Sequence, residues 1–266
     1  MIGVVERSNV CAANNIPGPS YPSLFAAVLW TVATTREYSP DEMRAFLSDY
    51  MPMKFGSSLT SKLTKKNKDG QCYWERGEAK DRPFVLAIAD FHIPGGKDEG
   101  PGSMTYMQSA LPHYLYGHRL DWERVDGTLV TRAVKTEEHV HGTKSVPSGF
   151  FDLAGAENIS AVLFSNAGTL SKFDRMGVAA GFGAPDHRYL RFGTRLNRDP
   201  NSAIGDPFVE ELGVEHGEGW ADELQLFHNP NAKNPLPERS MPGITEHFFK
   251  DGNHLSYSVG TPVLGS

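Results

Sequence analysis

Two apolar runs of strand length constrain the fold of this chain more than any other feature. Residues Phe84 to Phe91 read FVLAIADF, and residues Ile159 to Phe164 read ISAVLF. Short runs that are apolar on nearly every residue are typical of strands covered on both faces. We expect the two runs to be largely buried strands of one sheet. With helices between and around them, they predict an α/β fold with a mixed central sheet and a loop-rich C-terminal half.

Helical patterns surround these runs. Residues 24–33 (LFAAVLWTVA) are too few to cross the hydrocarbon core of a bilayer, so a buried helix is expected there. Ser39 can cap the start of an amphipathic helix that we expect to stop at Pro52. Further helices are predicted over residues 58–66 and 220–227.

The chain of 266 residues is expected to form one domain that possibly lacks an N-terminal portion. Residues 1–92 form a strand-helix-strand part that starts with a short strand at Ile2 to Glu6, and residues 93–266 form a mixed part. Within the latter, Leu129 to Val140 is expected to be a more exposed antiparallel segment.

Charge and cysteine content limit the class of protein. The net charge of −6 and the pI near 5.9 argue against a protein coated in nucleic acid. The first 80 residues are nevertheless weakly basic, with ten lysines and arginines against eight acidic residues, which is compatible with a polyanion partner. Two cysteines, Cys11 and Cys72, exclude a disulfide scaffold, so we expect a cytoplasmic protein without a membrane segment.

Polar residues at the end of the first apolar run are one candidate site. Asp90 and His92 follow the predicted strand, where a carboxylate and an imidazole could bind a metal or move a proton. His139 and His141 alternate onto one face of a strand and could complete a metal-dependent hydrolase, if they lie near the first pair. A strand-terminal aspartate that caps a turn is the competing interpretation.

The stretch after the second apolar run, SNAGTLSKFDRMG, is the second candidate. Ser165 is expected to begin a turn, and residues 170–176 to begin a helix. Lys172 and Arg175 would share an exposed face and flank an anion at the helix N-terminus. Phe173 and Met176 would pack inward, and this packing alone would explain the segment as a structural turn and helix.

Several longer stretches together resemble a family of uncharacterised bacterial proteins that are sometimes labelled glycosaminoglycan attachment proteins. They are YMPMKFGSSLTSKLTKK, PFVLAIADFH, ENISAVLFSNAGTLSKFDRMGVAAGFG and LFHNPNAKNPLP. The resemblance covers the chain from about Tyr38 onward, and it implies no established activity.

The front part, with IGVVE, SSLTSKLTKK and PFVLAIADF in order, is weakly similar to the core of restriction-endonuclease-like PD-(D/E)XK proteins. That resemblance implies a nuclease acting on DNA, with Mg²⁺ bound by Glu6 and with Lys62 stabilising charge on the phosphate. The sequence departs from the pattern because Ser8 stands where a lysine is expected, and because no strand carrying a first acidic residue precedes Met1.

Three functions therefore stay open. The first is a restriction-endonuclease-like, possibly degenerate, metal-dependent nuclease with Glu6, Lys62, Asp90 and His92 as site residues. The second is a non-catalytic binding or assembly protein with an anion-binding loop at 165–177, and the third is a hydrolase with a metal on Asp90, His139 and His141. Lys62, Lys65 and Lys66 fall together on one side of the predicted helix, which is also typical of an ordinary solvated face.

Overall fold

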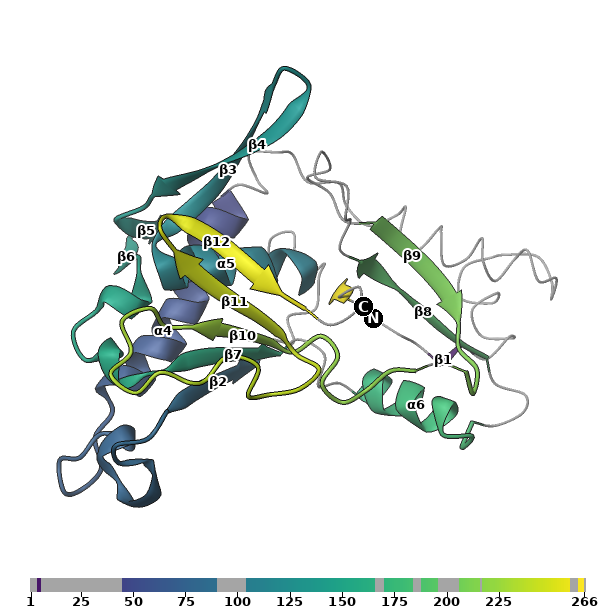
Figure 1. The fold of residues 1–266 in the computed structure, drawn as a ribbon, viewed down its shortest axis with the longest axis horizontal. Coiled ribbons are helices and arrows are strands. Elements are labelled where there is room, and N and C mark those ends of the chain that lie inside the picture. Colours follow the sequence, from purple (N-terminus) through teal and green to yellow (C-terminus); the bar gives the residue numbers. More distant parts are fainter. Residues whose placement is uncertain are drawn as a thin grey trace.

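The computed structural model describes residues 4–5, 45–89, 104–165, 170–183, 188–195, 206–215, 217–258 and 263–265. The helix expected at 24–33 and the cap at Ser39 lie outside these residues, as do Glu6, Asp90 and His92. The rest of the chain forms an α/β structure with a mixed central sheet (Figure 1).

The central sheet contains both predicted strands. Its five strands lie in the order β12 (Asn253–Tyr257), β11 (Thr245–Lys250), β10 (Gln225–His228), β7 (Ala161–Ser165) and β2 (Val85–Ala89). β2 runs parallel to β7 with Val85 opposite Ala161, while β10 runs antiparallel to β7. The expectation of one sheet is confirmed. β7 is mostly buried, but on β2 only Leu86 is, because β2 is an edge strand in the described part of the sheet.

Two helices cover one face of this sheet. α4 (Met51–Thr64) continues a π-helical turn at Phe46–Tyr50, and α5 (Met104–Tyr116) packs beside it. Pro52 does not end a helix as expected. It lies in the first turn of α4, where its missing N–H costs no hydrogen bond.

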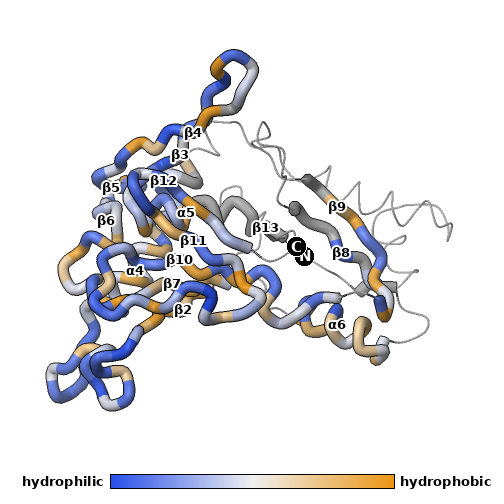
Figure 2. Tube along the Cα trace, viewed as in Figure 1, coloured by the Kyte–Doolittle hydropathy of each residue, from blue (hydrophilic) through white to orange (hydrophobic). Residues whose placement is uncertain are grey.

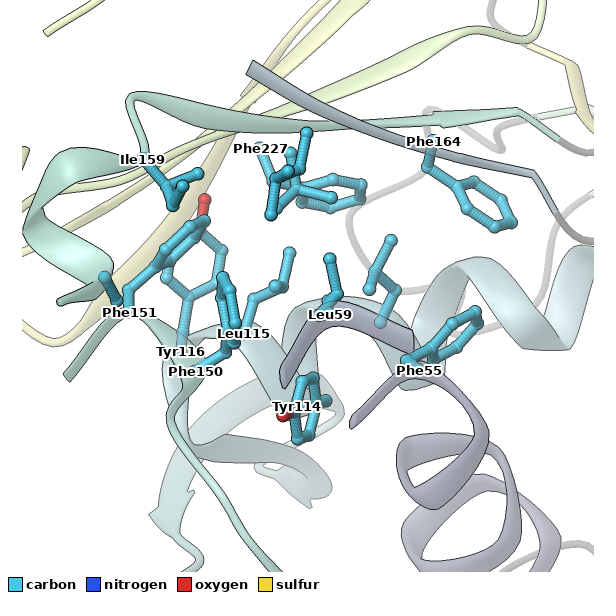
Figure 3. Close-up of a cluster of buried hydrophobic side chains, with 14 of the residues drawn as sticks. Phe55, Leu59, Tyr114, Leu115, Tyr116, Phe150, Phe151, Ile159, Phe164 and Phe227 are labelled. Carbon is cyan, nitrogen blue, oxygen red and sulfur yellow. The ribbon is translucent and has the colours of Figure 1, made fainter. Parts of the chain in front are cut away.

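The main core lies between these helices and the sheet (Figure 3). Phe55 and Leu59 project from α4 toward Phe164 of β7 and Phe227 of β10, and the rings of Phe55 and Phe164 meet edge to face at 6.0 Å. Two 3-10 turns, η4 (Phe150–Asp152) and η5 (Ala156–Asn158), contribute further buried residues. The apolar face of α4 therefore packs against the buried face of the sheet.

Two β-hairpins follow α5. β3 (His118–Val125) pairs with β4 (Thr128–Lys135), and their ribbon projects from the body of the molecule in Figure 1. β5 (Glu138–His141) pairs with β6 (Lys144–Pro147). The antiparallel character expected for Leu129 to Val140 is confirmed.

A second sheet lies beside α6 (Leu170–Ala179). β8 (Arg188–Arg195) pairs with β1 (Val4–Val5), β9 (Asp206–Glu211) and β13 (Val263–Gly265), all antiparallel. The helix predicted at 220–227 is wrong, because residues 225–228 form β10 with all four residues buried between β7 and β11. Pairing with distant strands outweighs a local helical pattern at this position.

Candidate nucleic-acid interface

An exposed segment with an excess of positive charge lies between α4 and β2. We call residues 61–83 the basic lobe: it begins in the last turn of α4 and protrudes at the lower left of Figure 1, and it is mostly blue in Figure 2. It carries seven lysines and arginines against four aspartates and glutamates, in a chain whose net charge is −6. The basic residues are Lys62, Lys65, Lys66, Lys68, Arg76, Lys80 and Arg82.

A side-chain-capped turn shapes the first half of the basic lobe. α4 ends at Thr64, and the backbone of the next residue, Lys65, is extended. The Asn67 carbonyl oxygen Oδ1 then accepts hydrogen bonds from the backbone N–H groups of Asp69 and Gln71, both at 2.9 Å. Gly70 takes the positive φ of 78° that this turn requires.

Two short 3-10 turns, η2 (Tyr73–Glu75) and η3 (Gly77–Ala79), form the second half. The Cys72 N–H donates to Glu75 Oε2 at 2.6 Å, which caps η2. Trp74 packs on Phe84 with ring centroids 6.4 Å apart, and both contact the main core. The basic lobe is therefore held in shape by hydrogen-bonded turns and anchored to the core by an aromatic pair.

Three exposed lysines outside the basic lobe pair with carboxylates, whereas Lys144 has no ion pair among the described residues. Lys135, Lys233 and Lys250 each lie within about 3 Å of a carboxylate, at 2.9, 3.0 and 3.1 Å. By contrast, the lysines of the basic lobe form no ion pair with a carboxylate of the described residues. The one ion pair of the basic lobe among the described residues links Arg82 and Glu78. The lysines concerned are Lys62, Lys65, Lys66, Lys68 and Lys80, all exposed.

Lys62, expected to act on a phosphate, lies within the basic lobe. Its ammonium group stands over the Tyr73 ring at 5.9 Å from the centroid. The sequence grouped Lys62 with Lys65 and Lys66, and the structure adds Lys68 and Lys80 as further exposed lysines of the same segment. A count of charge over 61–83 alone would have shown the excess.

The other residues expected to act with Lys62 have no described position, since Glu6, Asp90 and His92 lie outside the described residues. The strands that precede them are described. β1, just before Glu6, pairs with β8, whereas β2, just before Asp90, belongs to the central sheet. A nuclease-like core would place both strands in one sheet, so the described pairing gives that core no support.

The histidine pair expected to hold a metal is placed differently. His139 is fully buried, its Nδ1 donates to the Ser48 carbonyl at 2.5 Å, and its Nε2 accepts from Ser148 Oγ at 2.8 Å. Both nitrogens are thus occupied, and burial lowers the pKa of His139 more than the Ser48 hydrogen bond raises it. His141 is exposed and packs edge-on against Tyr50.

These positions give the metal prediction for His139 and His141 no support among the described residues. A ligating imidazole needs a free nitrogen lone pair, and the one on His139 accepts a hydrogen bond. Among the described residues, no group of three or more His, Cys, Asp or Glu side chains could hold a metal ion.

Residues 170–179 form α6, which confirms the helix expected after the second apolar run. Ser165 is the last residue of β7, and the rest of the turn expected after it lies outside the described residues. The expected orientation of the helix is wrong: Lys172 and Arg175 are 4% and 1% exposed, whereas Phe173 is 63% exposed. The cations face inward, and no exposed anion site is formed by them.

A buried charge network explains this orientation. Arg175 donates to both carboxylate oxygens of Glu218, at 2.5 and 2.6 Å. Arg191 of β8 pairs with Glu223 and lies 3.7 Å from Glu218, and the Lys172 ammonium donates to the Asp222 carbonyl. Burial lowers the pKa of Lys172. Since a carboxylate of the same chain already neutralises Arg175, the helix has a structural role and does not need an external anion.

A row of histidines on the central sheet was also missed from the sequence. His247 and His254 share a hydrogen bond of 3.2 Å between Nδ1 and Nε2, and His228 Nε2 lies 2.9 Å from Glu246 Oε2. Burial lowers the pKa of His254 to about 4 and that of His247 well below its ordinary value. Sequence spacing carries no signal for such pairs, because His228 reaches Glu246 only through the pairing of neighbouring strands.

Comparison of the chain with protein-family models, curated proteins and solved structures finds no match. None of the helices in the described part of the chain has both the length and the apolar character needed to span a bilayer.

Proposed function

We propose that this protein binds DNA through the basic lobe. The observation that carries the proposal is the concentration of exposed lysines without a carboxylate partner in one short segment. Five exposed lysines of the basic lobe have no carboxylate partner among the described residues, while Lys135, Lys233 and Lys250 each have one. An unneutralised cluster of this kind exchanges its counterions, and those of DNA, for a direct contact with phosphates.

The charge of the remaining chain supports binding in one orientation. The basic lobe has an excess of three positive charges, and the whole chain is at −6, so the rest of the protein is acidic. DNA is repelled by the acidic parts and attracted to the protruding basic lobe. This distribution favours a local docking surface over a general coating of the protein with nucleic acid.

Metal-dependent cleavage of the bound DNA, as in restriction-endonuclease-like proteins, is the second candidate. Lys62 favours it, because this residue lies in the basic lobe and would meet a bound phosphate. Glu6 would hold Mg²⁺ in such a nuclease, which stays a prediction. Since β1 and β2 lie in different sheets, binding without cleavage is the function that the geometry supports best.

The binding proposal is tested with two variants of equal net charge. The first replaces Lys62, Lys65 and Lys66 with glutamine, and the matched control replaces Lys144, Lys233 and Lys250, which are exposed elsewhere. Fluorescence anisotropy with a labelled duplex in about 0.1 M salt should show roughly a 100-fold loss of affinity for the first variant and little change for the control. Equal losses in both variants, or no binding by the wild-type protein, would overturn the proposal.

Cleavage is tested separately on supercoiled plasmid in the presence of Mg²⁺. Nicking that disappears in Glu6→Gln and on chelation of the metal would support the nuclease. Intact plasmid with normal DNA binding would leave the protein as a binding protein only.

A further inference from the structure

We infer that the basic lobe recognises the phosphate backbone of double-stranded DNA without reading its sequence. The inference rests on the proposed DNA binding and specifies its substrate class. It follows from the contacts that the arginine, asparagine and aromatic side chains of the basic lobe already make.

The polar side chains that could read base edges are already engaged. Asn67 uses Oδ1 for two backbone N–H groups, and its Nδ2 donates to Gln71 Oε1 at 3.2 Å. Arg76 donates from Nε to the Cys72 carbonyl at 3.2 Å and from Nη2 to the Gln71 carbonyl at 3.1 Å. Arg82 is paired with Glu78 at 3.4 Å. Bidentate recognition of guanine by arginine, or of adenine by asparagine or glutamine, would require these contacts to break.

The aromatic side chains of the basic lobe are also engaged. The Arg76 guanidinium lies 4.6 Å from the centroid of the Tyr73 ring, and the Lys62 ammonium lies 5.9 Å from it. Trp74 packs on Phe84 against the main core. Proteins that prefer single strands stack bases on open aromatic rings, and the basic lobe offers no such ring.

The five unpaired lysines remain, and their chemistry suits phosphates. An ammonium group is a compact point charge on a flexible stem, which can follow the phosphates of a backbone and lacks the rigid fork of an arginine. Lys62 lies in the last turn of α4, and Lys65 and Lys66 directly follow the end of that helix. If all five contact phosphates, log K should fall with log salt with a slope of about −4.5 on a duplex, against about −3.5 on a single strand.

The experiment measures the affinity of the full chain for labelled duplexes of equal length, one rich in A·T, one rich in G·C and one mixed, and for the mixed single strand. We expect the three duplexes to agree within about threefold, because a single good base contact already discriminates by roughly fivefold or more. The single strand should bind no more tightly than the duplex. In Lys65→Gln/Lys66→Gln the affinity should fall by the same factor on every duplex, with a salt slope shallower by about 1.8.

The outcomes separate the two claims. A preference of about tenfold for one duplex sequence, or for the single strand, overturns backbone recognition while leaving DNA binding intact. Absence of binding to all four probes overturns the proposed function itself. Equal binding that persists unchanged in Lys65→Gln/Lys66→Gln also overturns the inference, because the contact would then lie elsewhere.

Discussion

Substitution of Glu218 by glutamine tests the buried charge network, the feature that most contradicts the sequence-based expectation for α6. The glutamate side chain is fully buried and receives two hydrogen bonds from Arg175. Burial alone would raise the pKa of Glu218, but the Arg175 hydrogen bond and the charges of Arg191, Arg175 and Lys172 outweigh it and hold the pKa below its ordinary value. The carboxylate is therefore charged at neutral pH.

The magnitude follows from the charges that remain. Without the Glu218 carboxylate, Arg175 loses its two charge-assisted hydrogen bonds and Arg191 loses a carboxylate at 3.7 Å. Removal of one partner from a buried ion pair costs about 3–5 kcal/mol, because the other charge stays buried without compensation. For a chain of this size, 1 kcal/mol corresponds to roughly 2–4 °C in melting temperature, so Glu218→Gln should melt at least 6 °C lower.

Thermal unfolding followed by circular dichroism at neutral pH checks this value. Glu238→Gln is the matched control, since Glu238 pairs with Lys250 at 3.1 Å but both side chains are more than half exposed, and such pairs contribute about 0–1 kcal/mol. The double variant Arg175→Met/Glu218→Leu should recover much of the loss, because a buried pair can be replaced by apolar side chains at little cost. If Glu218→Gln melts within 2 °C of the control, where roughly 6 °C is expected, the burial of this network is refuted.

Two further predictions concern packing and pH. A Cβ on Gly56 would lie 3.0 Å from the buried Tyr114 ring, so Gly56→Ala should destabilise the protein by about 1–3 kcal/mol. In α6, a Cβ on Gly177 meets nothing within 4 Å, so Gly177→Ala should stabilise the protein by about 0.5–1 kcal/mol. Urea unfolding measures both changes, and a change of the same sign in the two variants would contradict the packing described for Gly56. In the folded state the pKa of His254 is lowered to about 4, and that of His247 is also lowered. Both side chains therefore take up a proton near pH 6.5 in the unfolded state but not in the folded state. The free energy of unfolding should therefore be at its full value above pH 6.5 and fall toward pH 4, less steeply in His254→Gln, and an unchanged slope in that variant would refute the assignment.

Local patterns predicted part of the fold correctly. The apolar runs at 84–91 and 159–164 led to β2 and β7 in one sheet, because continuous apolar character over so few residues suits a strand between covering layers. The helix at 170–179 followed from its position after a strand. The strand at 225–228 was taken for a helix, since its pairing with β7 and β11 involves residues that are distant in sequence.

The orientation of α6 could not be predicted for a related reason. Phe173 and Met176 on one face and Lys172 and Arg175 on another favour burial of the apolar pair. The carboxylate that reverses this preference is Glu218, 43 residues further along the chain. No periodicity within the helix records the presence of such a partner. The excess of positive charge in the basic lobe, by contrast, is a property of consecutive residues and can be counted from the sequence alone.

Lysine labelling tests the central claim, DNA binding through the basic lobe, most directly. The wild-type protein is treated with a limiting amine-acetylating reagent with and without a saturating mixed-sequence duplex, and the modification of each lysine is measured by mass spectrometry. DNA binding through the basic lobe predicts protection of Lys62, Lys65, Lys66, Lys68 and Lys80, while Lys144 and Lys233 react at the same rate in both samples. Equal reactivity of the basic-lobe lysines with and without duplex, or protection confined to Lys144 and Lys233, would contradict it.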